Sequence, residues 1–175
     1  QSQVRTLEVT NRGTLQANAD LAEQVDAARA DLEQLGMSTG AVAVRGPGVR
    51  ITVRSAEGAG PRDEMRDEDL ATLVDGLWHA GAEAISINGE RLTAMTGIRN
   101  TGRSIHVGGR PIAEPYVVSA IGDPGSLQAN LLASSQGQVW FELARVLGFD
   151  YVPENVTELR LPAARLDPLR VVEQG

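Results

Sequence analysis

The sequence predicts an α+β protein in which an N-terminal coiled-coil helix precedes a ferredoxin-like layered domain, with a mostly antiparallel sheet and helices on one face. Two patterns favour this class. Residues 1–36 carry apolar side chains alternately three and four positions apart, which is the heptad spacing of a long helix. The rest of the chain alternates short period-two runs with glycine-rich turns and helical segments. We therefore expect a stalk helix over residues 1–36 and an α+β domain over residues 37–175.

Composition excludes several functional classes. The 175-residue chain is 42% hydrophobic but only 3% aromatic, so its core must be mainly aliphatic. A net charge of −7 argues against nucleic acid as a partner, because phosphate binding needs a basic surface. The absence of cysteine excludes disulfides and thiol catalysis. All 16 basic residues are arginines, which excludes lysine chemistry such as a Schiff base.

The heptad pattern of residues 1–36 predicts a parallel homodimer. Its a and d positions are mainly apolar over about five heptads. Asn11 and Asn18 both fall at position a, where paired amides fix the register of a parallel dimer. The alternative is a single amphipathic helix that packs on the domain. The predicted dimer contacts are Val4, Leu7, Asn11, Asn18, Leu21, Val25, Leu32 and Leu35.

The first part of the domain is expected to form two strands and a helix. Strands are predicted at 41–44 and 49–53, on either side of a glycine-rich turn at 45–48. A helix is predicted over residues 67–79, because three acidic residues at its start favour the positive end of the helix dipole. We expect Trp78 to lie on the buried face of this helix.

The second part is expected to contain further hairpins and two helical segments. Asn88-Gly89 is the strongest hairpin turn signal in the chain. Ser126 is the expected N-cap of the first of the later helices. The predicted strands are 84–87, 91–95, 104–107, 116–121 and 158–162, and the predicted helices are 127–133 and 139–147.

Catalytic chemistry finds little support in the sequence. His79 and His106 lack the spaced partners that a metal site or a catalytic dyad needs. The acidic residues between Asp63 and Asp69 lack calcium-loop spacing and are interpreted as a solvated loop and a helix start. We therefore expect no catalytic residue, no metal ion and no cofactor, and we expect that the protein is not an enzyme.

The stretch from residue 88 to residue 110 is the candidate binding region. It concentrates arginines among glycines in a chain that is otherwise acidic, and guanidinium forks suit carboxylate or phosphate groups. If residues 96–103 form a helical turn, Arg99 and Arg103 share one face. The alternative is that these arginines only pair with local acids. The candidate ligand- or partner-binding residues are Asn88, Arg91, Arg99 and Arg103.

Three segments, at residues 46–53, 69–92 and 98–124, together resemble the bacterial YlxW/YlxX-like family, which is called domain of unknown function 881. The resemblance implies a single-pass membrane protein with an N-terminal anchor, a coiled-coil stalk and an extracytoplasmic α+β domain. The anchor is absent from this chain, so contact with the membrane is expected only through it. Genes of the family often lie near cell-division and envelope genes, and the family provides no catalytic residues.

Together these inferences predict a non-catalytic, membrane-tethered envelope protein that acts as a dimeric interaction scaffold linked to cell division or cell-wall processes. We expect it at the bacterial cell membrane, with its domain on the extracytoplasmic side and envelope or division proteins as partners. The alternative is an extracytoplasmic sensor domain that binds a small anionic ligand. A pocket lined by Asn88, Arg91 and Arg99 favours the sensor, whereas a flat face or an open sheet edge favours the scaffold.

Overall fold

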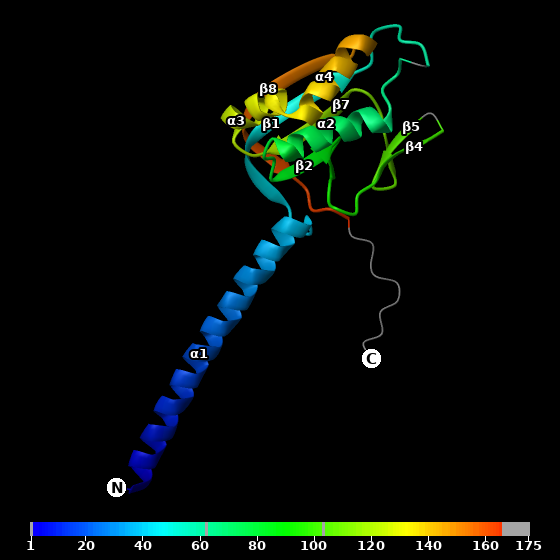
Figure 1. Cartoon of the computed structure of the whole chain (residues 1–175). Coiled ribbons are helices and arrows are strands. Elements are labelled where there is room, and N and C mark those ends of the chain that lie inside the picture. Colours follow the sequence, from blue (N-terminus) through cyan, green and yellow to red (C-terminus); the bar gives the residue numbers. More distant parts are fainter. Residues whose placement is uncertain (1, 62, 103, 166–175) are drawn as a thin grey trace. The chain divides into compact units, whose positions relative to one another are not determined.

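The computed structural model describes residues 2–61, 63–102 and 104–165, with side chains described from residue 11 onward except at residue 38. The chain divides into two compact units, Gln1–Ser38 and Thr39–Gly175. Helix α1 (Ser2–Thr39) forms the described part of the first unit, and its last residue, Thr39, is counted in the second unit (Figure 1). Nothing interrupts this helix at Gly13, where the missing side chain leaves open space around the backbone.

The second unit mixes strands and helices, which confirms the predicted α+β class. Its elements are β1 (Val44–Arg54), α2 (Asp67–His79), β2 (Ala84–Ile87), β3 (Glu90–Arg91), β4 (Ile98–Thr101), β5 (Ser104–Val107), β6 (Arg110–Ile112), β7 (Tyr116–Ile121), α3 (Pro124–Ala133), α4 (Ser135–Leu147) and β8 (Asp150–Leu161).

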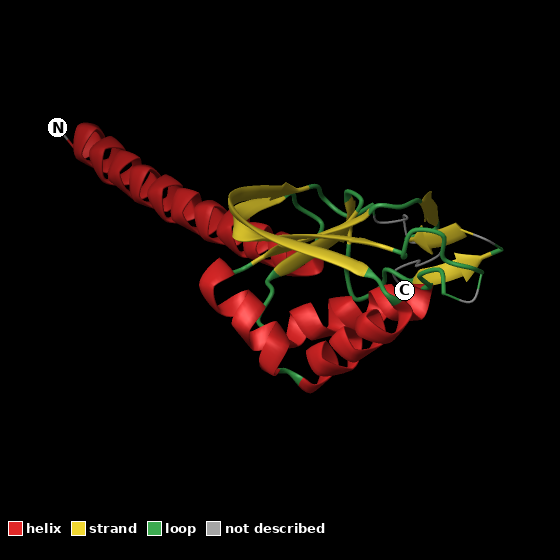
Figure 2. Ribbon diagram, turned by 90° about the horizontal axis from the view of Figure 1, so that it is seen from above, coloured by secondary structure: helices red, strands yellow, loops and turns green. Residues whose placement is uncertain are grey.

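The strands form two sheets, so the expectation of a single sheet is wrong. The larger sheet has the order β3-β2-β7-β1-β8, and every pair of neighbours in it is antiparallel. Helix α2 connects β1 to β2, and helices α3 and α4 connect β7 to β8. Figure 2 shows the helices of this unit on one side of the large sheet. The smaller sheet has the order β4-β5-β6 and is also antiparallel.

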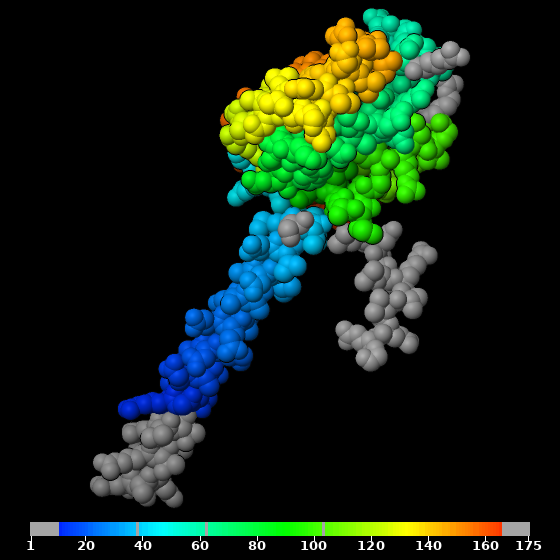
Figure 3. Space-filling view, viewed as in Figure 1, coloured from blue at the N-terminus to red at the C-terminus, as the bar shows by residue number. Residues whose placement is uncertain are grey.

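The core lies between the large sheet and helices α2 to α4, and Figure 3 shows atoms of α2 and α4 covering this side of the unit. Strand residues such as Ile51 and Ile85 meet helix residues such as Leu70 and Leu77 there, all at most 1% exposed. Trp140 on α4 is the buried tryptophan, with 0% exposure. The expectation that Trp78 is buried is wrong, because this side chain flanks the buried face of α2 and is 38% exposed.

The predicted turn at residues 45–48 is a β-bulge within one long strand. Strand β1 pairs with β8 on both sides of a register shift between Gly46 and Gly48. Gly48 also lies against β7, because a Cβ added there would be 2.0 Å from the Ala120 carbonyl oxygen. Continuous pairing with β8 therefore overrides the local turn signal, and it also extends the strand predicted at 158–162 back to Asp150.

Helix α4 begins at Ser135 and not at the predicted residue 139, and three further differences from prediction have local reasons. The returning strand is only Glu90–Arg91, because residues 93–96 form a turn closed by threonine hydroxyls. Residues 98–101 form a strand, so the helical turn considered for 96–103 is wrong. Helix α3 begins at Pro124 and is capped by Asp123, whose carboxylate accepts from the Gly125 N–H at 3.1 Å, so Ser126 is not its N-cap.

Candidate functional site

The small sheet has one buried and one open face. Ile105 and Val107 on β5 are buried against the core. Because side chains alternate along a strand, Arg99 on β4 and His106 on β5 project from the opposite face. These two residues are directly paired across the antiparallel strands. Their side chains therefore begin about 5 Å apart on the same surface.

A groove of about 780 Å³ lies over this open face. Arg99, His106 and Arg165 line it, so two guanidinium groups and one imidazole share the same hollow. No carboxylate is among the described residues that line it. The groove is therefore a cationic site in a chain whose net charge is −7.

Arg99 and Arg165 form no ion pair with another residue of the described part of the chain. Across the described residues, neither lies within 4.0 Å of a carboxylate, whereas six other arginines do. The paired arginines are Arg29, Arg50, Arg66, Arg110, Arg145 and Arg160. Within the described part of the chain, no carboxylate therefore competes with an external anion for these two guanidinium groups.

A threonine turn forms one wall of the groove. The Thr96 hydroxyl accepts from the Thr93 N–H at 3.0 Å, and the Thr93 hydroxyl accepts from the Met95 N–H at 3.1 Å. These bonds hold the turn and leave Met95 at its tip, 89% exposed. At the end of this wall a Cβ added to Gly97 would lie 3.3 Å from Arg99 Nε. Glycine therefore leaves room for the Arg99 side chain along the strand.

Arg165 reaches the groove from the segment that follows β8. The Ala164 N–H donates to the Gly40 carbonyl oxygen at 2.7 Å, which ties this segment to the start of the second unit. Arg91 on β3 lies beneath the same junction, with Nη1 3.4 Å from the Val42 oxygen and 3.5 Å from the Pro162 oxygen. Arg91 is 6% exposed, and burial lowers the pKa of its guanidinium group. It bonds residues on either side of this junction and is not among the described residues that line the groove.

Asn88 has a positive φ of 48° in the β2–β3 turn and is fully engaged there. Its Nδ2 donates to the Ala113 oxygen at 2.8 Å, and its Oδ1 accepts from the Val117 N–H at 2.7 Å. Asn88 therefore fixes the start of β7.

Of the four candidate binding residues, only Arg99 lines the groove, and Arg103 lies outside the described residues.

Sequence reasoning did not assign His106 and Arg165 to a site. The alternation of residues 104–107 predicts that His106 faces away from the core, and a hairpin register centred on residues 102–103 would have placed it opposite Arg99. Arg165 has no comparable local signal, because it reaches the groove through the long-range bond between residues 164 and 40.

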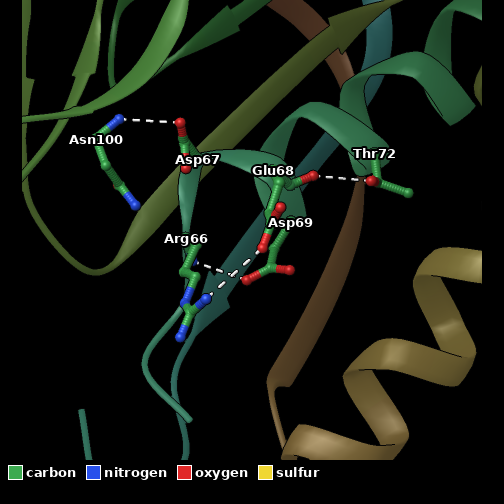
Figure 4. Close-up of polar contacts among 6 residues, drawn as sticks. All are labelled: Arg66, Asp67, Glu68, Asp69, Thr72 and Asn100. Atoms are coloured by element: carbon green, nitrogen blue, oxygen red, sulfur yellow. Dashed lines mark hydrogen bonds and ion pairs between the residues drawn. The ribbon is translucent and has the colours of Figure 1, made fainter. Parts of the chain in front are cut away.

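The acidic cluster at the start of α2 has a structural role (Figure 4). The Asp69 carboxylate accepts from the Arg66 N–H at 2.8 Å, which closes the first turn of the helix. Asp67 accepts from the Asn100 N–H at 3.0 Å and so joins α2 to β4. Burial raises the pKa of Asp69, with a smaller contribution from the neighbouring acids, while the Arg66 N–H opposes the shift.

A second hollow, of about 380 Å³, lies beside Ser55 and Glu114. The Glu114 carboxylate accepts from both the N–H and the hydroxyl of Ser55, and the Ser55 hydroxyl oxygen accepts from the Met65 N–H at 2.8 Å. Burial, together with Glu114 and Glu64, raises the pKa of Tyr116 there. These contacts connect the loop after β1 to the start of β7.

In the part of the chain with described side chains, no group of three or more metal-ligating residues is placed to hold a metal ion.

The predicted dimer contacts lie on α1. Asn11 and Asn18 are exposed, and Leu21, Val25 and Leu32 are 59%, 41% and 70% exposed. Leu35 is exposed as well, whereas the side chains of Val4 and Leu7 lie outside the described residues. Over the described residues, none of the helices has both the length and the apolar character needed to cross a bilayer.

Comparison with known proteins identifies relatives in Mycobacterium tuberculosis and Bacillus subtilis. UPF0749 protein Rv1823 of Mycobacterium tuberculosis (strain ATCC 25618 / H37Rv) is 34% identical over 138 residues, which cover 67% of this chain and 45% of that protein. UPF0749 protein YlxW of Bacillus subtilis (strain 168) is 36% identical over 106 residues, covering 58% of this chain and 46% of that protein. The chain thus spans about half the length of the curated relatives it matches.

The fold has a solved counterpart. An uncharacterized conserved protein from Mycobacterium tuberculosis is similar with a TM-score of 0.67 and 27% identity, covering 83% of this chain and 99% of that one. None of these descriptions states an activity. The family described as "Bacterial protein of unknown function (DUF881)" matches residues 31–172, which include the end of α1 and most of the second unit. The chain therefore belongs to the DUF881 family.

Proposed function

We propose that this protein is a non-catalytic, dimeric interaction scaffold, tethered at the bacterial cell membrane with its α+β unit on the extracytoplasmic side. Its partners are envelope or division proteins, which bind the α+β unit. The observation that carries the proposal is the apolar seam of α1, defined here by Leu21, Val25 and Leu32. The membrane and envelope part of the proposal rests on the family resemblance.

The seam favours pairing with a second copy of the same chain. Leu21 and Val25 are four residues apart and Val25 and Leu32 are seven apart, which places all three on one side of the 38-residue helix. Large apolar side chains exposed in water gain roughly 25 cal/mol for each Å² that a partner covers. A second α1 offers the same spacing, and Asn11 and Asn18 at position a favour a parallel, in-register pair.

The second unit offers a surface suited to a scaffold. Strand β8 is 12 residues long, lies at one end of the large sheet and pairs with β1 along one side. An edge of this length can receive an extended segment of a partner by strand addition. The strand order also supports the ferredoxin-like arrangement as part of the proposal, since β1 and β2 run parallel with antiparallel β7 between them.

Sedimentation velocity of the whole chain tests the dimer. The variant Val25→Glu/Leu32→Glu places two charges on the seam, and Ala19→Glu/Ala30→Glu is a matched control that adds the same charge at exposed positions off the seam. At tens of micromolar, we expect the unmodified chain and the control to sediment as dimers and the seam variant as a monomer. A monomeric unmodified chain, or a seam variant that remains dimeric, would contradict the proposal.

A further inference from the structure

The cationic groove on β4 and β5 has features of a binding site that the scaffold role does not require. Arg99 and His106 project from a surface that is fixed on its other side by the core contacts of Ile105 and Val107. The strand pair therefore fixes the backbone positions of Arg99 and His106. Arg165 joins the same groove from a different part of the chain.

Charge distribution favours an anionic occupant. The chain carries 23 acidic residues, yet no carboxylate is among the described groove-lining residues. Arg99 and Arg165 have no ion-pair partner in the described part of the chain. Two guanidinium groups without a counter-charge repel each other, and an oxyanion between them removes that repulsion and accepts their forked hydrogen bonds.

The other lining groups are consistent with the same ligand chemistry. His106, directly opposite Arg99 on the neighbouring strand, adds an imidazole N–H donor. Thr93, Thr96 and Thr101 add hydroxyl groups, and the glycines at 97, 108 and 109 allow close approach to the backbone. A volume of about 780 Å³ accommodates a small molecule and exceeds what a single inorganic ion fills.

We propose that this groove binds a ligand bearing a phosphate or carboxylate group, and that Arg99 and Arg165 form the principal contacts with its oxyanion. His106 assists from the strand beside Arg99. The exposed Met95 at the rim contacts the less polar part of the ligand. The proposal is independent of dimerisation, because all of these residues belong to the second unit.

Isothermal titration calorimetry of the whole chain with pyrophosphate and with citrate, at constant ionic strength, tests the site. The two probes separate phosphate from carboxylate recognition. We expect at least one of them to bind, and Arg99→Gln and Arg165→Gln each to weaken that binding by about tenfold or more. Arg99→Lys should also weaken it, because lysine keeps the charge but loses the planar fork.

The matched control is Arg54→Gln, which removes the same charge from an exposed arginine of the same unit outside the groove. The control should bind the probe as tightly as the unmodified chain does. All the variants should have the melting temperature of the unmodified chain, since the substitutions change exposed side chains. Binding of one probe identifies the favoured oxyanion, and binding of both indicates recognition of the shared chemistry. Failure of both probes to bind, or equal weakening by the control, would overturn the proposal.

Discussion

Replacing Trp140 by alanine tests the assignment of the core. Trp140 has no exposed surface, and its ring centroid lies 5.3 Å from that of Phe141 and 5.2 Å from that of Tyr151. A buried tryptophan covers about 200 Å², which corresponds to about 5 kcal/mol of transfer free energy at roughly 25 cal/mol per Å². Truncations of this kind cost about 3–5 kcal/mol. We expect Trp140→Ala to lower the free energy of unfolding by that amount.

Trp78 provides the matched control for this experiment. It is 38% exposed, so water enters the space that its removal leaves and no closed cavity forms. Trp78→Ala should therefore cost only about 1–2 kcal/mol. Both variants are compared by urea unfolding at one protein concentration, followed by far-UV circular dichroism because the fluorescent residues themselves change. A loss for Trp78→Ala equal to or greater than that for Trp140→Ala would refute this assignment.

Substitutions at two further positions, Gly48 and Asp69, test local features of the fold. Gly48→Ala should lower the melting temperature and the free energy of unfolding, the latter by about 1–3 kcal/mol or more, because the new Cβ would lie 2.0 Å from the Ala120 oxygen. Gly13→Ala is the control and should not lower the melting temperature, because nothing lies within 4 Å of a Cβ added there. Similar melting curves for the two variants would exclude the close contact at Gly48. Burial raises the pKa of Asp69, so the folded state holds this proton more tightly than the unfolded chain does. The resulting contribution to stability is present below the ordinary pKa of 3.8 and is lost as the pH rises through the raised value. In urea unfolding, Asp69→Asn should remove this decline of stability with rising pH. Asp69→Ala should cost about 1 kcal/mol, because it removes the acceptor that caps the Arg66 N–H. An unchanged pH profile in Asp69→Asn would contradict the direction of the pKa shift.

Elements with strong local signals were predictable from the sequence. Helix α2 occupies residues 67–79 as expected, because its acidic start and its apolar spacing agree with each other. The β2–β3 turn also follows from Asn88-Gly89, which both adopt positive φ, 48° and 83°. The prediction that Trp78 is a core residue was wrong. The apolar spacing of a short helix defines the centre of its buried face better than the edges of that face, and Trp78 lies at an edge.

Features that depend on pairing between distant segments were not predictable in the same way. Gly46-Pro47-Gly48 has the composition of a turn, and only pairing with β8 turns it into a bulge. The groove likewise depends on contacts between segments that are distant in the sequence. Arg99 lies in the stretch selected for its arginines, but Arg165 reaches it through contacts between the two ends of the second unit. Asn88 and Arg91 were chosen by the same composition, and each forms hydrogen bonds within the fold.

Disulfide crosslinking through a single introduced cysteine tests whether α1 forms a parallel dimer, because the chain has no cysteine of its own. In a parallel, in-register dimer, Leu32→Cys places two thiols face to face across the seam. Ala30→Cys, on the outer side of the helix, is the matched control. Under mild oxidation, we expect rapid formation of a crosslinked dimer for Leu32→Cys and little for Ala30→Cys. Equal crosslinking of the two variants, or none at position 32, would contradict the parallel dimer.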